Sequence, residues 1–241
     1  MSDILLSLEG IHTHIGQYHI LQGVDLSVPM GGVTMLLGRN GAGKTTTLRT
    51  IMGLWKASAG RIHFDGRDIT GLSTPDISRL GIAYVPENMG IFAGLTVEEN
   101  MQLAALEGPM DATRLDWIFA AFPPLKTFWK FPAGNLSGGQ KQMLSVARAV
   151  IEKRRLYLID EPSKGLAPAI VTSLATALRD LKEQDATILL VEQNFPMARA
   201  LGDTVAVMDD GHVIHSGTMQ ELKEDKALQE RLMGLSMETG A

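Results

Sequence analysis

The sequence predicts an α/β fold, in which helices cover a largely parallel sheet. Short apolar runs of strand length alternate with helical patterns along the chain. Several runs, among them residues 33–37 and 188–191, are apolar at consecutive positions, as strands buried on both faces must be. The alternation stops over residues 88–135, where helical patterns and a Pro-rich aromatic stretch occur without a convincing strand. We therefore expect a helical subdomain inserted into the α/β core.

Each expected element follows from a local pattern. Length and apolar content predict strands at residues 24–28, 33–37, 82–85, 156–159, 188–191 and 205–208. Helical periodicity predicts core helices at residues 45–52, 139–151 and 169–181, and helices of the insert at residues 97–106 and 111–119. Alternation on either side of the turn at residues 30–32 predicts a small antiparallel sheet near the N-terminus.

Composition excludes several classes of protein. The 241 residues include no cysteine, which rules out disulfides, thiol catalysis and cysteine-based zinc sites. The net charge of −5 argues against a protein whose main task is to bind nucleic acid, because such domains are usually basic. The first residues lack a basic stretch followed by an apolar one, so no signal peptide is expected. The longest apolar runs are strand-sized, far below the roughly 20 residues of a transmembrane helix.

A glycine-rich motif follows the expected strand at residues 33–37. It matches the phosphate-loop pattern G-x-x-x-x-G-K-[ST] in full, with a strand before it and a helical pattern after it. In such a loop, backbone N–H groups and the helix N-terminus face phosphate oxygens. Lys44 is expected to reach the β- and γ-phosphates of ATP, and Thr45 to bind Mg²⁺. The residues assigned to the nucleotide here are Gly38, Arg39, Asn40, Gly41, Ala42, Gly43, Lys44, Thr45 and Thr46.

Two carboxylates follow the apolar run at residues 156–159. Asp160 comes at the strand end, where it would hold Mg²⁺ beside the phosphate loop. Glu161 would then point toward the γ-phosphate, where it can orient or deprotonate a water. Adjacent acids are common in turns, so the assignment depends on the complete phosphate loop upstream.

A second anion site is predicted where a later helical pattern begins. Ser137 is a good N-cap, and Gly138 and Gly139 expose backbone N–H groups ahead of Gln140. One chain already places its nucleotide at Lys44. The ligand expected at the second site is therefore the γ-phosphate of a nucleotide held by another subunit.

With these motifs the chain resembles the ATP-binding subunits of ABC transporters over essentially its whole length. The resemblance implies a P-loop NTPase core of mixed sheet and flanking helices, a small N-terminal antiparallel sheet and the helical subdomain at residues 88–135, all within one ATP-binding domain of residues 1–241. It implies that Tyr18 stacks on adenine, although a tyrosine before a strand is as often simply packed. Residues 161–168 resemble the loop that contacts the opposite subunit. The segment after residues 84–86 resembles the loop where membrane subunits dock.

Two positions depart from the general ABC pattern. Glu87 stands where the family has a glutamine that touches Mg²⁺ and senses the γ-phosphate. Gln193 stands where the family has the switch histidine, so we expect it to contact the γ-phosphate as a neutral donor and to leave proton abstraction to Glu161. The alternative is that Gln193 only caps its strand and a partner ATPase supplies the switch. Both departures resemble the branch that serves branched-chain amino acid uptake, whereas residues 88–90 replace the basic residues usual there.

The function implied by the resemblance is ATP hydrolysis that powers solute import, with ATP and Mg²⁺ bound. Two ATPase subunits, similar but not identical, would sandwich two nucleotides beneath membrane permease subunits on the cytoplasmic face of the inner membrane. An external solute-binding protein would deliver branched-chain or other hydrophobic amino acids. Urea, amides or other small solutes are the alternative cargo.

Three ATPases outside transport are the rival interpretations. A chromosome-maintenance or DNA-repair ATPase of the same superfamily needs a long coiled coil, for which residues 88–135 are too short. A translation factor built from two fused domains needs a second phosphate loop. A non-hydrolysing regulator is opposed by Glu161 and supported by the missing switch histidine.

Two weaker patterns have structural explanations beside functional ones. His12 and His14 could share a strand face as a metal pair, but without a third ligand such residues are more often ordinary surface histidines. Four aromatic residues before the second anion site either pack within the helical subdomain or form a docking patch. They are Phe122, Phe128, Trp129 and Phe131.

Overall fold

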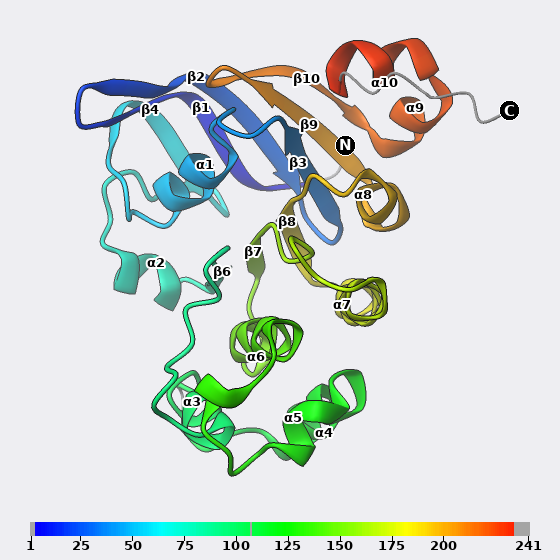
Figure 1. Cartoon of the computed structure of the whole chain (residues 1–241). Helices are drawn as coiled ribbons and strands as arrows, with labels where there is room; N and C mark the ends of the chain where they lie inside the picture. The colour runs from blue at the N-terminus through cyan, green and yellow to red at the C-terminus, as the bar shows by residue number, and fades with distance from the viewer. Residues whose placement is uncertain (1–2, 107, 234–241) are drawn as a thin grey trace, which may run out of the picture.

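The computed structural model describes residues 3–106 and 108–233, which form two β-sheets with flanking helices (Figure 1). The strands are β1 (Ile4–Ile15), β2 (Tyr18–Pro29), β3 (Val33–Gly38), β4 (Ala57–Phe64), β5 (Arg67–Asp68), β6 (Ile82–Val85), β7 (Leu156–Asp160), β8 (Thr187–Val191), β9 (Thr204–Asp209) and β10 (His212–Thr218). The larger sheet has the order β10-β9-β3-β8-β7-β6; it is parallel except for β10, which runs antiparallel to β9. The smaller sheet, β2-β1-β4-β5, is antiparallel.

Helices connect most of the strands of the larger sheet. They are α1 (Lys44–Ile51), α2 (Thr74–Arg79), α3 (Val97–Gln102), α4 (Ala112–Ala121), α5 (Pro123–Thr127), the 3₁₀ turn η1 (Ala133–Asn135), α6 (Gly138–Val150), α7 (Pro168–Glu183), α8 (Phe195–Leu201), α9 (Met219–Glu224) and α10 (Lys226–Met233). Within the described ranges, none of these helices combines the length and the apolar content that crossing a bilayer would take.

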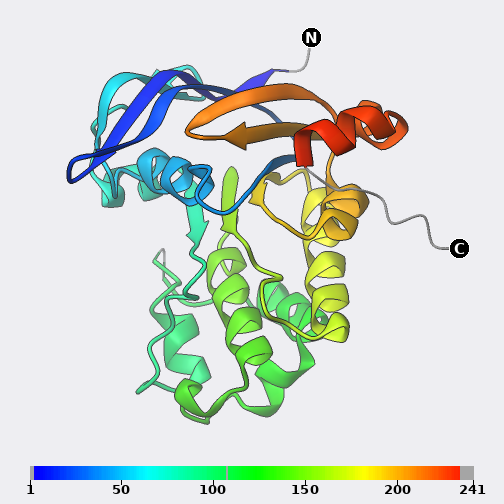
Figure 2. The same ribbon diagram turned by 45° about the horizontal axis from the view of Figure 1, so that its top comes forward.

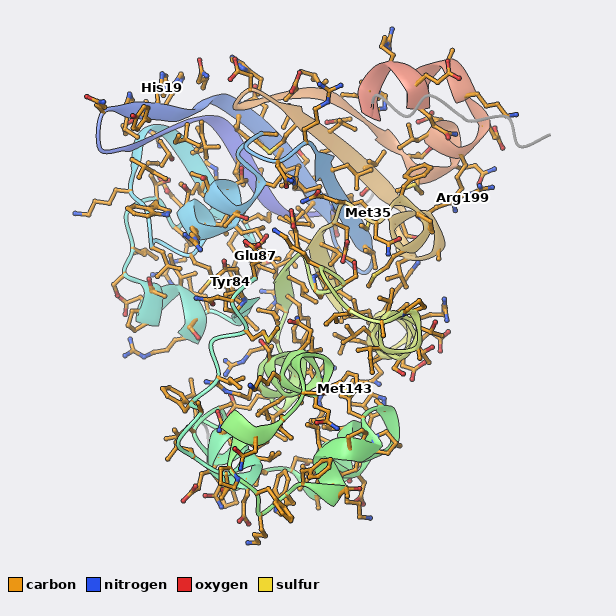
Figure 3. The ribbon with its side chains drawn as sticks, in the orientation of Figure 1. His19, Met35, Tyr84, Glu87, Met143 and Arg199 are labelled. Atoms are coloured by element: carbon orange, nitrogen blue, oxygen red, sulfur yellow. The ribbon has the colours of Figure 1, made fainter. Side chains whose placement is uncertain are left out.

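Side chains of the larger sheet alternate between two apolar cores. In β3, Met35 belongs to the core formed with α6, α7 and α8, whereas Leu36 belongs to the core shared with the smaller sheet and α1 (Figure 3). In β8, Leu190 likewise belongs to the core with α6, α7 and α8, and Leu189 to the core shared with the smaller sheet. Both faces of the sheet are therefore covered, which is why consecutive positions of these strands are apolar.

The N-terminal sheet confirms one prediction and corrects its details. The sheet is antiparallel as predicted, but the turn at residues 30–32 leads from β2 in the smaller sheet to β3 in the larger one. The predicted strand at residues 24–28 is only part of β2. Strands β1, β4, β5 and β10 have no counterpart among the predicted strands, because polar residues and glycine interrupt their apolar positions and leave no apolar run longer than three residues.

Residues 88–135 contain α3, α4, α5 and η1 and, among those described, no strand. Both ribbon views place these helices at the end of the molecule opposite the smaller sheet (Figures 1 and 2). The helix predicted over residues 97–106 is too long, since α3 ends at Gln102. Met101 of α3 and Ile118 of α4 share one core with Met143 of α6 and with β3 and β8. The apolar core is thus continuous from the sheet into this helical region.

The four aromatic residues before α6 divide by burial. Phe122 is completely buried, and Phe128 and Trp129 pack against the same core. Phe131 is 55% exposed, although its ring meets that of Phe128 edge to face. Packing within the helical region therefore accounts for three of the four rings and leaves Phe131 at the surface.

Candidate nucleotide site

Three neighbouring parallel strands bring the predicted catalytic segments together. The strands β3, β8 and β7 are adjacent in the larger sheet, so the residues that follow their C-terminal ends meet at one edge. The phosphate loop follows β3, Glu161 follows β7, and Gln193 comes shortly after β8. Segments that are far apart in the sequence therefore form one site.

The phosphate loop needs its glycines for conformation and for space. Gly38 and Gly43 have φ values of 147° and 103°, in the left-handed region that favours glycine. A Cβ at Gly38 would collide with the carbonyl oxygen of Met208. Helix α1 begins directly after Gly43, and the Lys44 ammonium turns back to donate to the carbonyl oxygens of Gly38 and Arg39 at 2.8 and 3.0 Å. The backbone carbonyl groups of the loop therefore hold the Lys44 ammonium against the loop.

Asp160 is a buried carboxylate with two hydroxyl donors. Thr45 Oγ1 donates to Asp160 Oδ1 at 3.0 Å, and the Tyr84 hydroxyl donates to Oδ2 at 3.3 Å. Burial raises the pKa of Asp160 to about 6; the bond from Thr45 opposes this, and the nearby carboxylates of Glu161 and Glu87 add to it. Burial and the charge of Asp160 raise the pKa of Tyr84 to about 12, so Tyr84 remains a donor.

Thr45 and Asp160 fit a magnesium ion by the chemistry of their donors. Mg²⁺ takes oxygen ligands, commonly one or two carboxylates together with phosphate oxygens and water. A hydroxyl and a carboxylate lie together here, beside the loop that faces phosphate. Glu87, the third predicted ligand, instead accepts a bond from Lys164 in this structure. Tyr84 and Glu87 lie at the junction between the sheets and the helical region (Figure 3).

Glu161 occupies the centre of the site. Its φ of 46° turns the chain sharply after β7, and its N–H donates to the Val191 carbonyl oxygen at 2.9 Å. Its carboxylate is buried, with Oε1 3.4 Å from Lys44 Nζ. Gln193 Nε2 donates both to Glu161 Oε1 and to Asn40 Oδ1, each at 2.6 Å. Gln193 thus connects the predicted base to the phosphate loop.

The side chain that caps the next helix belongs to Asn194. Asn194 Oδ1 accepts from Met197 N–H at 3.1 Å and forms the N-cap of α8. The side chain of Gln193 is directed into the site instead. The cap of α8 is therefore Asn194 and not Gln193.

A cavity of about 300 Å³ lies over the phosphate loop. Ile20 of β2 lines it, and Tyr18 shares the face of Ile20 because residues two apart on a strand point the same way. Tyr18 is 66% exposed, so it is not packed in the core. The described lining residues are Ile20, Asn40, Gly41, Gly43, Lys44, Thr45, Thr46, Glu87, Glu161 and Lys164.

Comparison with known proteins identifies the family. The family model for ABC transporters matches residues 21–164. The chain belongs to the ABC transporter family. As an ATP-binding cassette of this family it is an ATPase.

Relatives match nearly the whole cassette. The high-affinity branched-chain amino acid transport ATP-binding protein BraG of Pseudomonas aeruginosa is 35% identical, over 95% of this chain and 100% of its own. The probable branched-chain amino acid transport ATP-binding protein LivF of Archaeoglobus fulgidus is 37% identical, over 91% of this chain and 94% of its own. A nucleotide-free ATP-binding cassette from an ABC transporter superposes with a TM-score of 0.79 at 27% identity, covering 95% of this chain and 98% of that one.

The second predicted anion site of this ABC ATPase lies apart from the first. None of the described residues 137–140 lines the cavity over the phosphate loop. Ser137 Oγ accepts from Gln140 N–H at 3.3 Å, and Gln140 Oε1 accepts from Ser137 N–H at 2.9 Å, which is a complete capping box at the start of α6. Gly139 lies against Ile170, where a Cβ would be tight, and Gly138 is exposed. The cassette therefore does not bring its own 137–140 segment to its own phosphate loop.

Glu192 is a buried carboxylate beside the site to which sequence reasoning assigned no role. It is 2% exposed and accepts four bonds, from the N–H and hydroxyl of Ser163 at 3.0 and 2.8 Å and from the N–H groups of Gln193 and Asn194, both at 3.2 Å. Burial raises its pKa, and these bonds oppose the shift. Glu192 therefore connects the loop after β7 to the segment that carries Gln193. Its position directly after the apolar run at residues 188–191 is a signal that could have revealed it.

No histidine is among the described residues that line the cavity over the phosphate loop. His12 Nδ1 and His19 Nε2 are 2.9 Å apart, and the rings of His14 and His19 stack at 4.2 Å on the β1–β2 hairpin (Figure 3). In the described part of the chain, no group of three or more His, Cys, Asp or Glu side chains is arranged to hold a metal ion. His12 and His14 therefore contact histidine and Ser58 side chains.

Proposed function

We propose that this ABC ATPase powers the import of branched-chain or other hydrophobic amino acids. The observation that carries the proposal is its similarity, over at least 91% of its length, to two proteins named for branched-chain amino acid transport. The cassette would act at the cytoplasmic face of the inner membrane, bound to permease subunits. An external solute-binding protein would supply the amino acid.

The first role of the site is to bind ATP with its phosphates at the loop after β3. Backbone N–H groups of residues 38–45 and the Lys44 ammonium would hold the β- and γ-phosphates. Tyr18 would stack on adenine, since it is exposed on the strand that lines the cavity. Thr45, Asp160 and Glu87 would hold Mg²⁺, which when bound offsets the charge on the phosphate oxygens.

The second role of the site is to activate water. Glu161 would orient the water and accept its proton, because it lies beside Lys44 at the end of the phosphate loop. Gln193 would donate its amide to the γ-phosphate, and an amide cannot titrate in that position. Its present bonds to Glu161 and Asn40 support this role, since both partners border the loop.

Two such subunits would complete each other's sites. Because residues 137–140 of one chain lie apart from its own cavity, we infer that they face the γ-phosphate bound by a second, similar ATPase subunit. ATP binding would close the pair, and hydrolysis would open it. The helical region at residues 88–135, proposed as the inserted subdomain, and the loop at Glu87 would pass this motion to the permease.

Transport assays in the source cell test the proposed cargo. Deletion of the gene that encodes this chain should lower the uptake of radiolabelled leucine, isoleucine and valine, and expression of the wild-type protein should restore this uptake. Glu161→Gln should be produced at the same level and fail to restore uptake. Loss of urea uptake alone would replace amino acids by the alternative cargo. Unchanged uptake of every solute, with ATPase activity retained, would favour a non-transport ATPase.

A further inference from the structure

Lys164 lies between two carboxylates of the nucleotide site. Its ammonium donates to Glu87 Oε1 at 2.6 Å and is 3.5 Å from Glu161 Oε2. Lys44 approaches the other oxygen of Glu161, at 3.4 Å. Each carboxylate oxygen of Glu161 therefore has an ammonium beside it, one from the phosphate loop and one from the loop after β7.

Lys164 makes the numbers of positive and negative groups that line the cavity over the phosphate loop equal. Its described lining holds two carboxylates, Glu87 and Glu161, and two ammonium groups, Lys44 and Lys164. Lysine is charged at neutral pH, and the Lys164 ammonium lies within 3.5 Å of an oxygen of each carboxylate. Lys164 is also 55% exposed, which leaves its long side chain free to change partners.

We propose that Lys164 binds the terminal phosphate of ATP and that Glu87 competes with this phosphate for the Lys164 ammonium. The inference rests on the proposed placement of ATP at the phosphate loop. A phosphate oxygen and a carboxylate oxygen are both strong acceptors for an ammonium, so one can replace the other. With Mg²⁺ bound, Glu87 would be one of the carboxylates that hold the ion, which would leave the Lys164 ammonium to the phosphate.

The ion pair also connects two loops that face different partners. Glu87 follows β6 and leads into the helical region, whereas Lys164 belongs to the loop proposed to face the opposite subunit. The arrival of ATP would thus break a bond between these loops. A glutamine at position 87, as in the general family pattern, has no charge with which to retain the lysine. Glu87, which departs from the family pattern, and Lys164 therefore act together as one ion pair that ATP would open.

Calorimetry of nucleotide binding tests the first half of the proposal. Lys164→Ala should weaken the binding of MgATP by about tenfold, the lower limit for a hydrogen bond to a charged group, and should weaken MgADP much less. Lys182→Ala is the matched control, because it removes a lysine whose ammonium also donates to a carboxylate at 2.6 Å, from Asp203, outside the site. Equal losses for ATP and ADP, or an equal effect of Lys182→Ala, would overturn the proposal.

A double-mutant cycle without metal tests the competition. With EDTA present, Glu87→Gln should tighten ATP binding, because Lys164 is released to the phosphate. The gain should vanish when Lys164→Ala is already present. A gain that persists in that background would show only a general effect of removing negative charge and would overturn the competition, as would no gain at all.

Lys44→Ala separates this inference from the proposed function. If Lys44→Ala abolishes the binding of both nucleotides and Lys164→Ala changes neither, only the role of Lys164 is wrong. If Lys44→Ala still binds ATP normally, ATP does not lie at the phosphate loop and both proposals fail.

Discussion

Helices α1 and α6 both begin beside glycine, since Gly43 precedes α1 and Gly138 and Gly139 open α6, yet only the start of α1 belongs to a site assembled within the chain. Behind the phosphate loop, Asp160, Glu161 and Gln193 converge because their strands are neighbours. At the start of α6, the side chains of Ser137 and Gln140 accept from each other's backbone N–H groups. The same local feature therefore has different roles, and the elements packed beside it decide which.

The largest expected effect distinguishes the two N-termini directly. Lys44→Ala should lose most ATP binding by the isolated subunit, on the order of a few kcal/mol, because it removes the ammonium that pairs with the phosphates. Titration calorimetry measures this loss. Near-native affinity of Lys44→Ala for ATP would show that residues 38–45 are not the phosphate-binding loop.

Glu161→Gln should separate binding from chemistry at the first N-terminus. The amide keeps the shape of the side chain but cannot accept a proton, so turnover should fall by about 10²-fold or more while ATP still binds. With its partner subunit present, the variant should accumulate as a dimer with nucleotide between the subunits, visible by light scattering. Hydrolysis at the wild-type rate would mean that another residue is the base.

Gln193 offers a finer test of the same site. Gln193→Ala should slow turnover with ATP affinity nearly intact; removing one preorganised donor costs about 2.7–4 kcal/mol as an upper limit. Gln193→His should retain activity, because a histidine can also donate. Steady-state ATPase measurements on the assembled transporter decide the matter. An unchanged rate in Gln193→Ala would assign the switch to the partner ATPase.

Glu192 should make the stability of the site depend on pH. Burial raises its pKa in the folded protein above the ordinary 4.5, so the folded state binds this proton more tightly than the unfolded chain does. The contribution of Glu192 to the free energy of unfolding therefore increases as the pH falls through its folded-state pKa. The contribution reaches its full value below the pKa of this group in the unfolded chain.

Glu192→Gln removes this dependence. The variant cannot titrate, and it leaves one of four donors unpaired, at a cost of about 1–3 kcal/mol. Urea unfolding at several pH values should therefore show a difference between wild type and variant that widens as the pH falls from neutral. A difference independent of pH would contradict the raised pKa.

Ser137→Ala should give the smallest effect and the clearest contrast with Lys44→Ala. Loss of the cap should lower the free energy of unfolding by about 1 kcal/mol, whereas ATP binding by the isolated subunit should not change. Hydrolysis by the assembled pair should fall, since the second subunit's phosphate loses a donor. Weakened ATP binding by the isolated subunit would show that the start of α6 acts within its own chain.

Local sequence determined much of this protein. The phosphate loop, the acidic strand end and the parallel strands of the larger sheet depend on periodicity and on glycine positions, which are local properties. Helix boundaries were less accurate, as at Gln102, because packing rather than propensity ends such helices. Strands β1, β4 and β10 were not predicted individually, because polar residues and glycine interrupt their apolar positions and pairing with neighbouring strands completes them.

Only the tertiary structure decided which polar and charged side chains meet. Lys164 and Glu87 are 77 residues apart, and Gln193 and Asn40 are 153 apart. The first pair meets because β6 and β7 are parallel neighbours, and the second because β3 and β8 are. A lysine in a surface loop has no periodic pattern of its own, so its partner follows from strand order alone.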